Sequence, residues 1–518
     1  MGDLTFDPDE IPLTATSNSS PPDLRRELNI FDLAFAQILI VIVPEFFGTA
    51  AKAGRAHGIL WLLAIFTFFI PQALVVSYLN RLLPLEGGLF EWARHAFGDR
   101  IGFLVAWNMW LNTTVQVSQI GLITTTYLTY AFGPKLNWLA TNPLALASAS
   151  VLLILGMMIV ARLGLGVGKW LSNAGSFFTV LTLAALAAIP FFRTVRATPY
   201  AYHPLPLIHP ALTLFTFSVF SKMTFGALTG FELVAIFAGE SRNPARNLAR
   251  SILFTAPLIA LLYILGTSSI LAYVSPDSID VIGPIPQALN LALSGFAFAR
   301  FLVPVVILLL LTNYLSSYTL YFSTNTRLPL VAGWDHLLPR WFSVLHPKYQ
   351  TPVNSIFFVG IVALVASIAA SVGAGNQEAF VLLQIWSWTF YGLAYLAMFA
   401  IPLSAGKMLN KGLSADNPLS GATPSNLPDL CFPEQRLSDQ NFSETRTTRP
   451  GAWLRLLAFS GFLITLMFVA LSIFPIVDVT SRFAYSMKIV LVVLGANLIG
   501  WLIYHAGSLK REFSEIDK

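Results

Sequence analysis

Long apolar stretches recur along the whole chain and are the first pattern that the sequence shows. The stretches 59–79 and 151–160, for example, contain no charged residue. A helix rises about 1.5 Å per residue, so roughly 20 apolar residues are needed to cross the hydrocarbon core of a membrane. Strand-like alternation of apolar and polar residues is absent, which argues against a transmembrane β-barrel. The pattern predicts an all-α membrane protein with about twelve transmembrane helices, at 30–51, 57–79, 102–131, 143–161, 170–192, 211–238, 252–274, 300–324, 354–372, 379–402, 453–475 and 484–505.

Composition and charge support this prediction and set the expected orientation. Of the 518 residues, 55% are hydrophobic and 11% are charged, which is too little charge to cover a soluble protein of this size. The net charge of +5 comes from basic residues that concentrate in alternate loops, near 81–100, 162–169, 242–250, 327–348 and 407–411. This is the positive-inside pattern, so the charge reports orientation and not nucleic-acid binding. We expect an integral protein of the cell (plasma or inner) membrane with both termini cytoplasmic.

Polar segments divide the chain into five predicted parts. The first of them is acid-rich and lacks the basic flank and short apolar core of a signal peptide. The parts are a cytoplasmic N-terminal tail (1–29), a ten-helix core (30–402) in two repeats at about 30–192 and 211–402, and a cytoplasmic loop (403–452). Two final transmembrane helices (453–505) and a cytoplasmic tail (506–518) follow. Within the core, the segment 85–98 is too short and too charged to span. It predicts an amphipathic helix at the cytoplasmic face, with Phe90 and Trp92 as interfacial anchors.

Two of the predicted spans are interrupted at matching positions of the two halves. The first span contains Pro44 and Glu45, and the sixth contains Gly226 and Gly230. Such a pair of interruptions is typical of inverted-repeat transporters. A broken helix frees backbone groups that lipid cannot satisfy, so it survives only where it lines a polar cavity or is packed by neighbouring helices. The exposed N–H groups at a helix N-terminus also carry about half a positive charge, which suits a carboxylate.

Three ionisable residues lie at or beside these interruptions. An ionised group at bilayer depth costs about 2.5–3.5 kcal/mol on insertion scales, so each is a candidate functional residue. Glu45 is expected to accept a proton or to balance the charge of a substrate amine. Glu232 is the expected gating or coupling carboxylate. Lys222 is assigned to gating or coupling too; it would read a substrate carboxylate, neutralise one of the glutamates or extend to the outer surface.

Polar residues also form ribbons along several spans. In the third span, Asn108, Asn112, Gln116 and Gln119 follow the spacing of one helix face. Two explanations remain open for such ribbons, namely cavity lining and hydrogen bonding between helices. The residues assigned to cavity lining are Asn112, Gln116, Gln119, Ser317 and Gln384. The seven histidines show no metal-ligand spacing and no nucleophile–base motif occurs, so we expect no metal, no cofactor and no enzyme activity.

Three segments resemble the amino acid–polyamine–organocation (APC) superfamily of permeases. GFELVAIFAGESRNPARN at 230–247 is similar to its sixth helix and the following loop, and PLEGGLFEWARHAFG at 84–98 to its loop after helix two. TRLPLVAGWDHLLPRWFSVLHPKYQTP at 326–352 is similar to its loop after helix eight. The order and spacing of the three segments match the family.

The resemblance implies a LeuT-like core of two inverted five-helix repeats plus two further helices. It also implies a substrate between the unwound parts of helices one and six, which are by position Ile42, Val43, Pro44, Glu45 and Phe46, and Phe225, Gly226, Ala227, Leu228, Thr229 and Gly230. Glu232 falls where the arginine/agmatine antiporter branch has its helix-six glutamate. The sequence departs from the family in lacking the Gly-Ser/Thr-Gly of helix one and the helix-five lysine, near which Thr179 and Thr182 stand.

The sequence thus predicts a secondary active transporter that moves amino acids, amines or polyamines by alternating access. The expected partners are a small amino acid or amine substrate, membrane lipid and protons as coupling ion, in symport or exchange. A non-transporting amino acid sensor or scaffold that keeps the permease fold is the alternative.

Overall fold

The computed structural model describes residues 43–83, 88–163, 181–188, 190, 203–232, 244–331, 334, 340–346, 349, 351–404 and 450–516. Within these ranges the chain is helical and contains no strand, apart from an isolated β-bridge between Leu345 and Pro352. The fold class is therefore all-α, as the apolar pattern predicts. The predicted tail 1–29 and most of the predicted loop 403–452 lie outside the described residues.

Eight described helices are long and apolar enough to cross a membrane. They are Gly54–Leu82 (η1 Gly54–Ala56, α3 His57–Ala64, η2 Ile65–Phe69 and α4 Ile70–Leu82), α9 (Pro143–Leu163), Phe254–Leu271 within α13 (Pro244–Leu271), α15 (Ala299–Asn325), α17 (Val353–Ser371), α18 (Asn376–Ser404), α20 (Ala452–Leu471) and Arg482–Gly507 within α21 (Arg482–Ile516). The other elements are α2 (Phe46–Ala51), α5 (Leu89–Phe97), α6 (Asp99–Val117), α7 (Ile120–Phe132), η3 (Gly133–Leu136), α8 (Asn137–Thr141), α11 (Leu214–Leu228), η6 (Pro276–Ser278), α14 (Pro284–Leu293), α16 (Leu328–Val331) and η8 (Arg340–Ser343). The predicted spans 30–51 and 170–192 lie only partly within the described residues, so the count of twelve remains a prediction.

The predicted single helix at 102–131 is wrong in one respect, because α6 and α7 are separated by a tight turn at Ser118 and Gln119. The main-chain N–H of Ser118 donates to Val115 O (3.1 Å) and that of Gln119 to Gln116 O (3.2 Å), three residues back instead of four. The Ser118 hydroxyl also donates to Thr114 O at 3.3 Å. Back-bonding of this kind bends helices, and the chain resumes as α7 in a new register.

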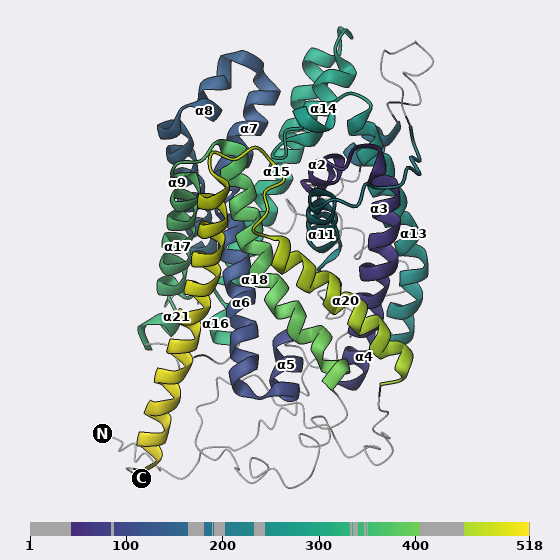
Figure 1. Cartoon of the computed structure of the whole chain (residues 1–518). Helices are drawn as coiled ribbons and strands as arrows, with labels where there is room; N and C mark the ends of the chain where they lie inside the picture. The colour runs from purple at the N-terminus through teal and green to yellow at the C-terminus, as the bar shows by residue number, and fades with distance from the viewer. Residues whose placement is uncertain are drawn as a thin grey trace, which may run out of the picture.

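The helices form two groups that contain corresponding parts of the two halves of the chain (Figure 1). In one group, α2 and the α3–α4 span from the first half pack against α11 and α13 from the second. In the other, α6, α7 and α9 from the first half pack against α15 and α17 from the second, with α18 against α6 and α17. This arrangement is the one expected of two five-helix repeats.

Helix α20 lies between the two groups, packed on α4, α11 and α18. Proline has no N–H, so Pro71 leaves the carbonyl of Thr67 without its usual helical partner. Ser460 of α20 donates to that carbonyl at 2.7 Å. The α3–α4 span accommodates the proline with a π-helical stretch, η2. One of the two C-terminal helices is thus hydrogen-bonded to the α3–α4 span.

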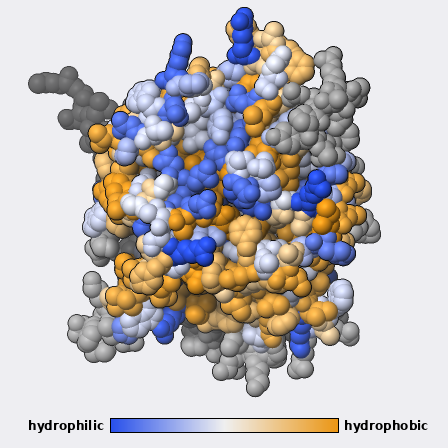
Figure 2. Space-filling model, turned by 45° about the horizontal axis from the view of Figure 1, so that its top comes forward, coloured by the Kyte–Doolittle hydropathy of each residue, from blue (hydrophilic) through white to orange (hydrophobic). Residues whose placement is uncertain are grey.

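Large apolar side chains cover the flanks of the molecule. Leu152 and Ile159 of α9 are 69% and 61% exposed, and Leu491 and Leu494 of α21 are 62% and 65% exposed. Soluble monomers rarely expose contiguous apolar surface of this extent, and lipid is the solvent that suits it. Figure 2 shows hydrophobic residues over the flank, and hydrophilic residues gathered at the end of the molecule that is turned forward. The protein is an integral membrane protein.

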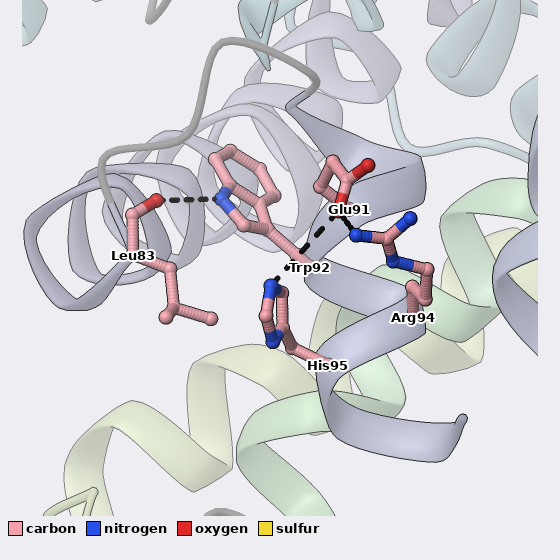
Figure 3. Close-up of polar contacts among 5 residues, drawn as sticks. All are labelled: Leu83, Glu91, Trp92, Arg94 and His95. Carbon is pink, nitrogen blue, oxygen red and sulfur yellow. Dashed lines mark hydrogen bonds and ion pairs between the residues drawn. The ribbon is translucent and has the colours of Figure 1, made fainter. Parts of the chain in front are cut away.

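The short helix predicted within 85–98 is present as α5, at the opposite end from α14 (Figure 1). Its predicted interfacial anchors are wrong. Phe90 is 7% and Trp92 1% exposed, because α5 packs on α6 and α18. The Trp92 indole donates to Leu83 O at 2.9 Å, and Glu91 faces Arg94 (3.0 Å) and His95 (3.9 Å), as Figure 3 shows. Trp92 therefore fixes the end of α4 and does not anchor the protein to lipid.

Candidate functional site

The sixth span is interrupted at Thr229 and Gly230. Helix α11 ends at Leu228, Thr229 is extended (φ −77°, ψ 170°) and Gly230 has φ +101°. Only glycine adopts such a backbone conformation readily, so the sequence specifies the place of the interruption. Helical geometry resumes at Phe231 and Glu232, where this described range ends.

Side chains from three other helices hold the backbone groups that this interruption frees. Gln72 of α4 donates through its amide to Leu228 O. Tyr263 of α13 donates to Ala227 O at 3.2 Å, and the main-chain N–H of Gly230 donates to the Tyr395 hydroxyl of α18 at 2.9 Å. The freed groups are therefore satisfied inside the protein, as burial at bilayer depth requires.

The chain is also non-helical just before α2, in the first span. Val43 lies outside any helix and Pro44 and Glu45 form a turn, after which α2 begins at Phe46. Ile42 and the residues before it lie outside the described residues, so the helix before this turn remains a prediction. The main-chain N–H of Val43 donates to the Tyr263 hydroxyl at 3.0 Å.

A single hydroxyl thus joins the non-helical segment before α2 to the interruption of the sixth span. Tyr263 accepts from Val43 of the first span and donates to Ala227 of the sixth. Its ring is stacked on Trp61 (centroids 4.1 Å apart) and contacts Phe47 (4.9 Å), which fixes its position. The structure therefore brings together the two segments that the sequence predicts to form one site.

Aromatic rings fill the space directly beside Gly226. A Cβ atom on Gly226 would lie 1.9 Å from Cζ of Phe46, so the ring rests on the glycine backbone. Phe46 in turn meets Trp388 of α18 edge-on at 5.6 Å, and Phe225 faces the same indole at 6.5 Å. In this conformation α2 and α11 are in close contact through the Phe46 ring, and only a glycine at position 226 leaves room for that ring.

Glu45 is buried, and one of its oxygens is without a partner. The side chain is 5% exposed and makes no capping bond to α2. Its Oε2 atom has no hydrogen-bond partner among the described residues. The carboxylate lies within electrostatic range of the hydroxyls of Tyr127, Tyr314 and Tyr318. This orphaned acceptor points to a polar group that the described residues do not supply.

Glu232 is buried as well, but its carboxylate is fully engaged. It is 2% exposed, and Tyr391 and Tyr395 each donate to one of its oxygens. These tyrosines are one turn apart on α18, so they approach the carboxylate from the same helix face. The segment that follows the sixth-span interruption is thereby bound to α18 through its charge.

Lys222 contacts neither glutamate. Its Nζ donates to Ser218 Oγ (2.6 Å), Leu471 O (3.0 Å) and Phe474 O (2.5 Å). The last two are carbonyls at the carboxyl end of α20 and in the turn just after it, where the helix dipole favours a cation. No ion pair among the described residues joins Lys222 to Glu45 or Glu232. The geometry therefore favours a link between α11 and α20 over the roles considered from the sequence.

The predicted polar ribbon of the third span is divided between different contacts. Asn108 donates to Asn497 of α21 at 2.7 Å, and Asn112 donates to the hydroxyl and the carbonyl of Ser387 on α18, each at 3.0 Å. Both amides therefore hold helices together. Gln119 is buried at the turn between α6 and α7, so it no longer continues the face of α6. For Gln116, Ser317 and Gln384, cavity lining remains a prediction.

Comparison with known proteins identifies the family. A family model described as amino acid permease matches residues 28–495. This chain belongs to the amino acid permease family. An uncharacterised transporter of Legionella pneumophila is 27% identical to the permease over 380 residues, covering 73% of this chain and 80% of that protein.

Two further relatives carry functional names. The probable agmatine/putrescine antiporter AguD of Lactococcus lactis is 22% identical over 71% of this chain and 76% of its own length. The branched-chain amino acid permease BcaP of Bacillus subtilis is 24% identical over 71% of this chain and 82% of its own length.

The comparison with solved structures agrees in fold. The match to the crystal structure of MhsT in complex with L-phenylalanine covers 85% of this chain and 97% of the MhsT chain, with a TM-score of 0.54 and 14% identity. The fold is LeuT-like, and the permease is a secondary transporter.

The residues that organise the site are mostly tyrosines that the sequence did not single out. Tyr263 and Tyr395 lie within apolar stretches, where an aromatic side chain is indistinguishable from core. One signal was available, because Tyr395 follows Tyr391 by four residues, the spacing of one helix face. The partner of Gln72, Leu228, by contrast, is 156 residues away and has no local sequence signature.

Proposed function

We propose that the permease moves small amino acids or amines across the cell membrane by alternating access, with the substrate held between the interrupted first and sixth spans. The observation that carries the proposal is the Tyr263 hydroxyl, which bonds both interruptions at once. Two chain segments without helical hydrogen bonding meet there beside an orphaned carboxylate, Glu45. An unpaired carboxylate at bilayer depth is costly unless a solute uses it.

We further propose that Glu232 couples transport to protons. The negative charge of its carboxylate strengthens the hydrogen bonds from Tyr391 and Tyr395. A proton on Glu232 removes that charge, weakens both bonds and frees the segment after Gly230 from α18. The two groups of helices then reorient relative to each other, which is the movement that alternating access requires.

Uptake into proteoliposomes tests this proposal. Labelled leucine, lysine, glutamate and putrescine are offered with a pH gradient, with unlabelled substrate inside, and with neither. Uptake driven by the pH gradient supports symport, and uptake that needs internal substrate supports exchange. If no compound of the panel enters under any condition, the proposed transport function is wrong. Binding without uptake would then favour the sensor or scaffold alternative.

We also propose that both termini are cytoplasmic, on the strength of the basic loops and the even number of spans that the sequence predicts. In this orientation α5 lies at the cytoplasmic end and α14 at the outer end (Figure 1). Protease accessibility of tags at the two termini in sealed right-side-out vesicles tests it. Digestion of either tag without lysis contradicts the orientation.

A further inference from the structure

The strongest unexplained feature of the molecule is the unpaired carboxylate of Glu45. It is 5% exposed, its Oε2 has no partner within the described ranges, and it does not cap the helix that follows it. Tyr314 of α15 is also 5% exposed, and its hydroxyl lies beside the Glu45 carboxylate, where it can donate to it. The two side chains come from opposite groups of helices. The Oε2 atom of Glu45 can still accept from a ligand.

The surroundings of Glu45 suit a cation. Tyr127 and Tyr314 meet edge-on with centroids 5.4 Å apart, and Tyr314 and Tyr318 are 6.2 Å apart. All three interact electrostatically with Glu45. Aromatic faces attract ammonium groups, and carboxylates and hydroxyls accept their hydrogen bonds. We call these four residues, Glu45, Tyr127, Tyr314 and Tyr318, the Glu45–tyrosine cluster. The cluster thus offers hydrogen-bond acceptors and aromatic rings to a positively charged group.

The protein supplies no positive charge of its own to this cluster within the described ranges. Lys222 is bound to the carbonyls at the end of α20. Lys52 donates to Asp277 O at 3.4 Å and interacts with the carboxylates of Asp277, Asp280 and Asp478. No ion pair between described residues involves Glu45. A buried carboxylate without a counter-charge is unfavourable, so a cation from outside the protein is the natural partner.

The same site is poorly suited to a substrate carboxylate. Main-chain N–H groups at helix interruptions are the usual anion-binding donors of this architecture. Here the N–H of Val43 and that of Gly230 already donate to the hydroxyls of Tyr263 and Tyr395. A carboxylate on the substrate would also face Glu45 itself. An amine without a carboxylate meets neither difficulty.

We propose that the Glu45–tyrosine cluster binds the cationic group of an organic amine without a carboxylate, such as a diamine, and thereby selects amines over amino acids. This inference rests on the proposed transport function and narrows its substrate class. Asp280 supports it, because Tyr130 donates to its Oδ2 at 2.9 Å and Tyr127 interacts with both Asp280 and Glu45. Negative charge therefore extends from the loop before α14 toward the cluster and raises the local concentration of cations.

The test compares the uptake and binding of amines and amino acids by the full-length permease. Labelled putrescine and agmatine are compared with leucine, lysine and glutamate in proteoliposomes, for the wild type, Glu45→Gln and Tyr314→Phe. Glu378→Gln is the matched control, because Glu378 is 4% exposed but accepts from Thr480, away from the cluster. Thermal melting of each purified variant, with and without putrescine, reports folding and binding independently of transport.

We expect amine uptake with a KM that rises about tenfold or more in Glu45→Gln, since a charge-assisted contact of this kind is typically worth at least that factor. Tyr314→Phe retains the ring and loses only the hydroxyl, so its KM should rise less. Glu378→Gln should leave the preference for amines unchanged.

Two results would overturn the inference while leaving the transport function intact. The first is uptake of leucine or glutamate by the wild type without uptake of either amine. The second is amine uptake with the same KM in Glu45→Gln as in the wild type. If nothing enters at all, the transport function fails. In that case a putrescine-dependent rise in the melting temperature of the wild type that disappears in Glu45→Gln would still support the amine site. If putrescine does not raise the melting temperature of the wild type, the amine site is overturned as well.

Discussion

Tyr395 donates a hydrogen bond to the carboxylate of Glu232, and the same hydroxyl accepts the main-chain N–H of Gly230 at 2.9 Å. One side chain of α18 therefore holds both the point where the sixth span is interrupted and the charged residue that follows it. Its ring also packs edge-on against Phe225 at 5.4 Å. The interruption is therefore positioned in part by α18.

Removal of this hydroxyl is expected to destabilise the protein. Tyr395→Phe leaves the Gly230 N–H without an acceptor and one Glu232 oxygen without a donor, and each buried unsatisfied group costs about 1–3 kcal/mol. Tyr391→Phe is the matched control, because it removes a bond to Glu232 and leaves Gly230 satisfied. We expect a lower melting temperature in detergent for Tyr395→Phe than for Tyr391→Phe. Equal melting temperatures would contradict the assigned role of the Gly230 contact.

A methyl group at Gly226 is expected to disrupt the closed arrangement of α2 and α11. Its Cβ would lie 1.9 Å from Cζ of Phe46, so the ring has to move, and overpacking of this kind costs about 1–3 kcal/mol. Gly156→Ala in α9 is the control, since nothing lies within 4 Å of the position of its Cβ. Uptake should fall in Gly226→Ala and persist in Gly156→Ala. The double variant Gly226→Ala, Phe46→Leu should recover part of the loss, and failure to recover would argue against the contact.

Lys222 is expected to secure α20 to α11. Lys222→Met leaves the Leu471 carbonyl without the Nζ donor, and hydrogen bonds to charged groups are worth about 1.5–3 kcal/mol. Amide hydrogen exchange at the end of α20 should therefore become faster. Lys488→Met is the control, because Lys488 donates to Val372 O at an exposed site and its loss should change little. Unchanged exchange in Lys222→Met would remove the proposed link.

Glu232 is expected to determine how uptake depends on pH. Glu232→Gln keeps an acceptor for the tyrosine hydroxyls but can no longer bind or release a proton. Uptake by this variant should be nearly independent of pH over a range in which the wild type varies. Glu91→Gln, at the partly exposed α5, should behave as the wild type does. Retention of the full pH profile in Glu232→Gln would assign the coupling proton elsewhere.

The sequence predicted the features that have a direct local signature. The length of the apolar stretches is one such feature, because a helix that crosses the hydrocarbon core requires it. The long described helices lie at the predicted spans. Gly230 is another, since its φ of +101° is accessible to glycine and interrupts the helix where expected. Features that depend on tertiary partners were not predicted. Lys222 was recognised as an ionisable group at bilayer depth, but two of its three acceptors lie about 250 residues away, at 471 and 474.

Side-chain direction accounts for the other differences. Trp92 suited a membrane interface by composition, but packing of α5 on α6 and α18 turned it inward to Leu83. The amide spacing in the third span predicted one continuous face, whereas the turn at Ser118 ended it before Gln119. Tyr263 and Tyr395 were counted as part of the apolar spans, although their hydroxyls satisfy the interrupted backbone.

An experimental structure of the full-length permease in a lipid nanodisc, with putrescine or whichever compound of the panel it transports, tests the central claim most directly. We predict ligand density between the interrupted first and sixth spans, beside Gly226 to Gly230 and within hydrogen-bonding distance of Glu45. A ligand bound elsewhere, with both spans running as continuous helices, would contradict the account.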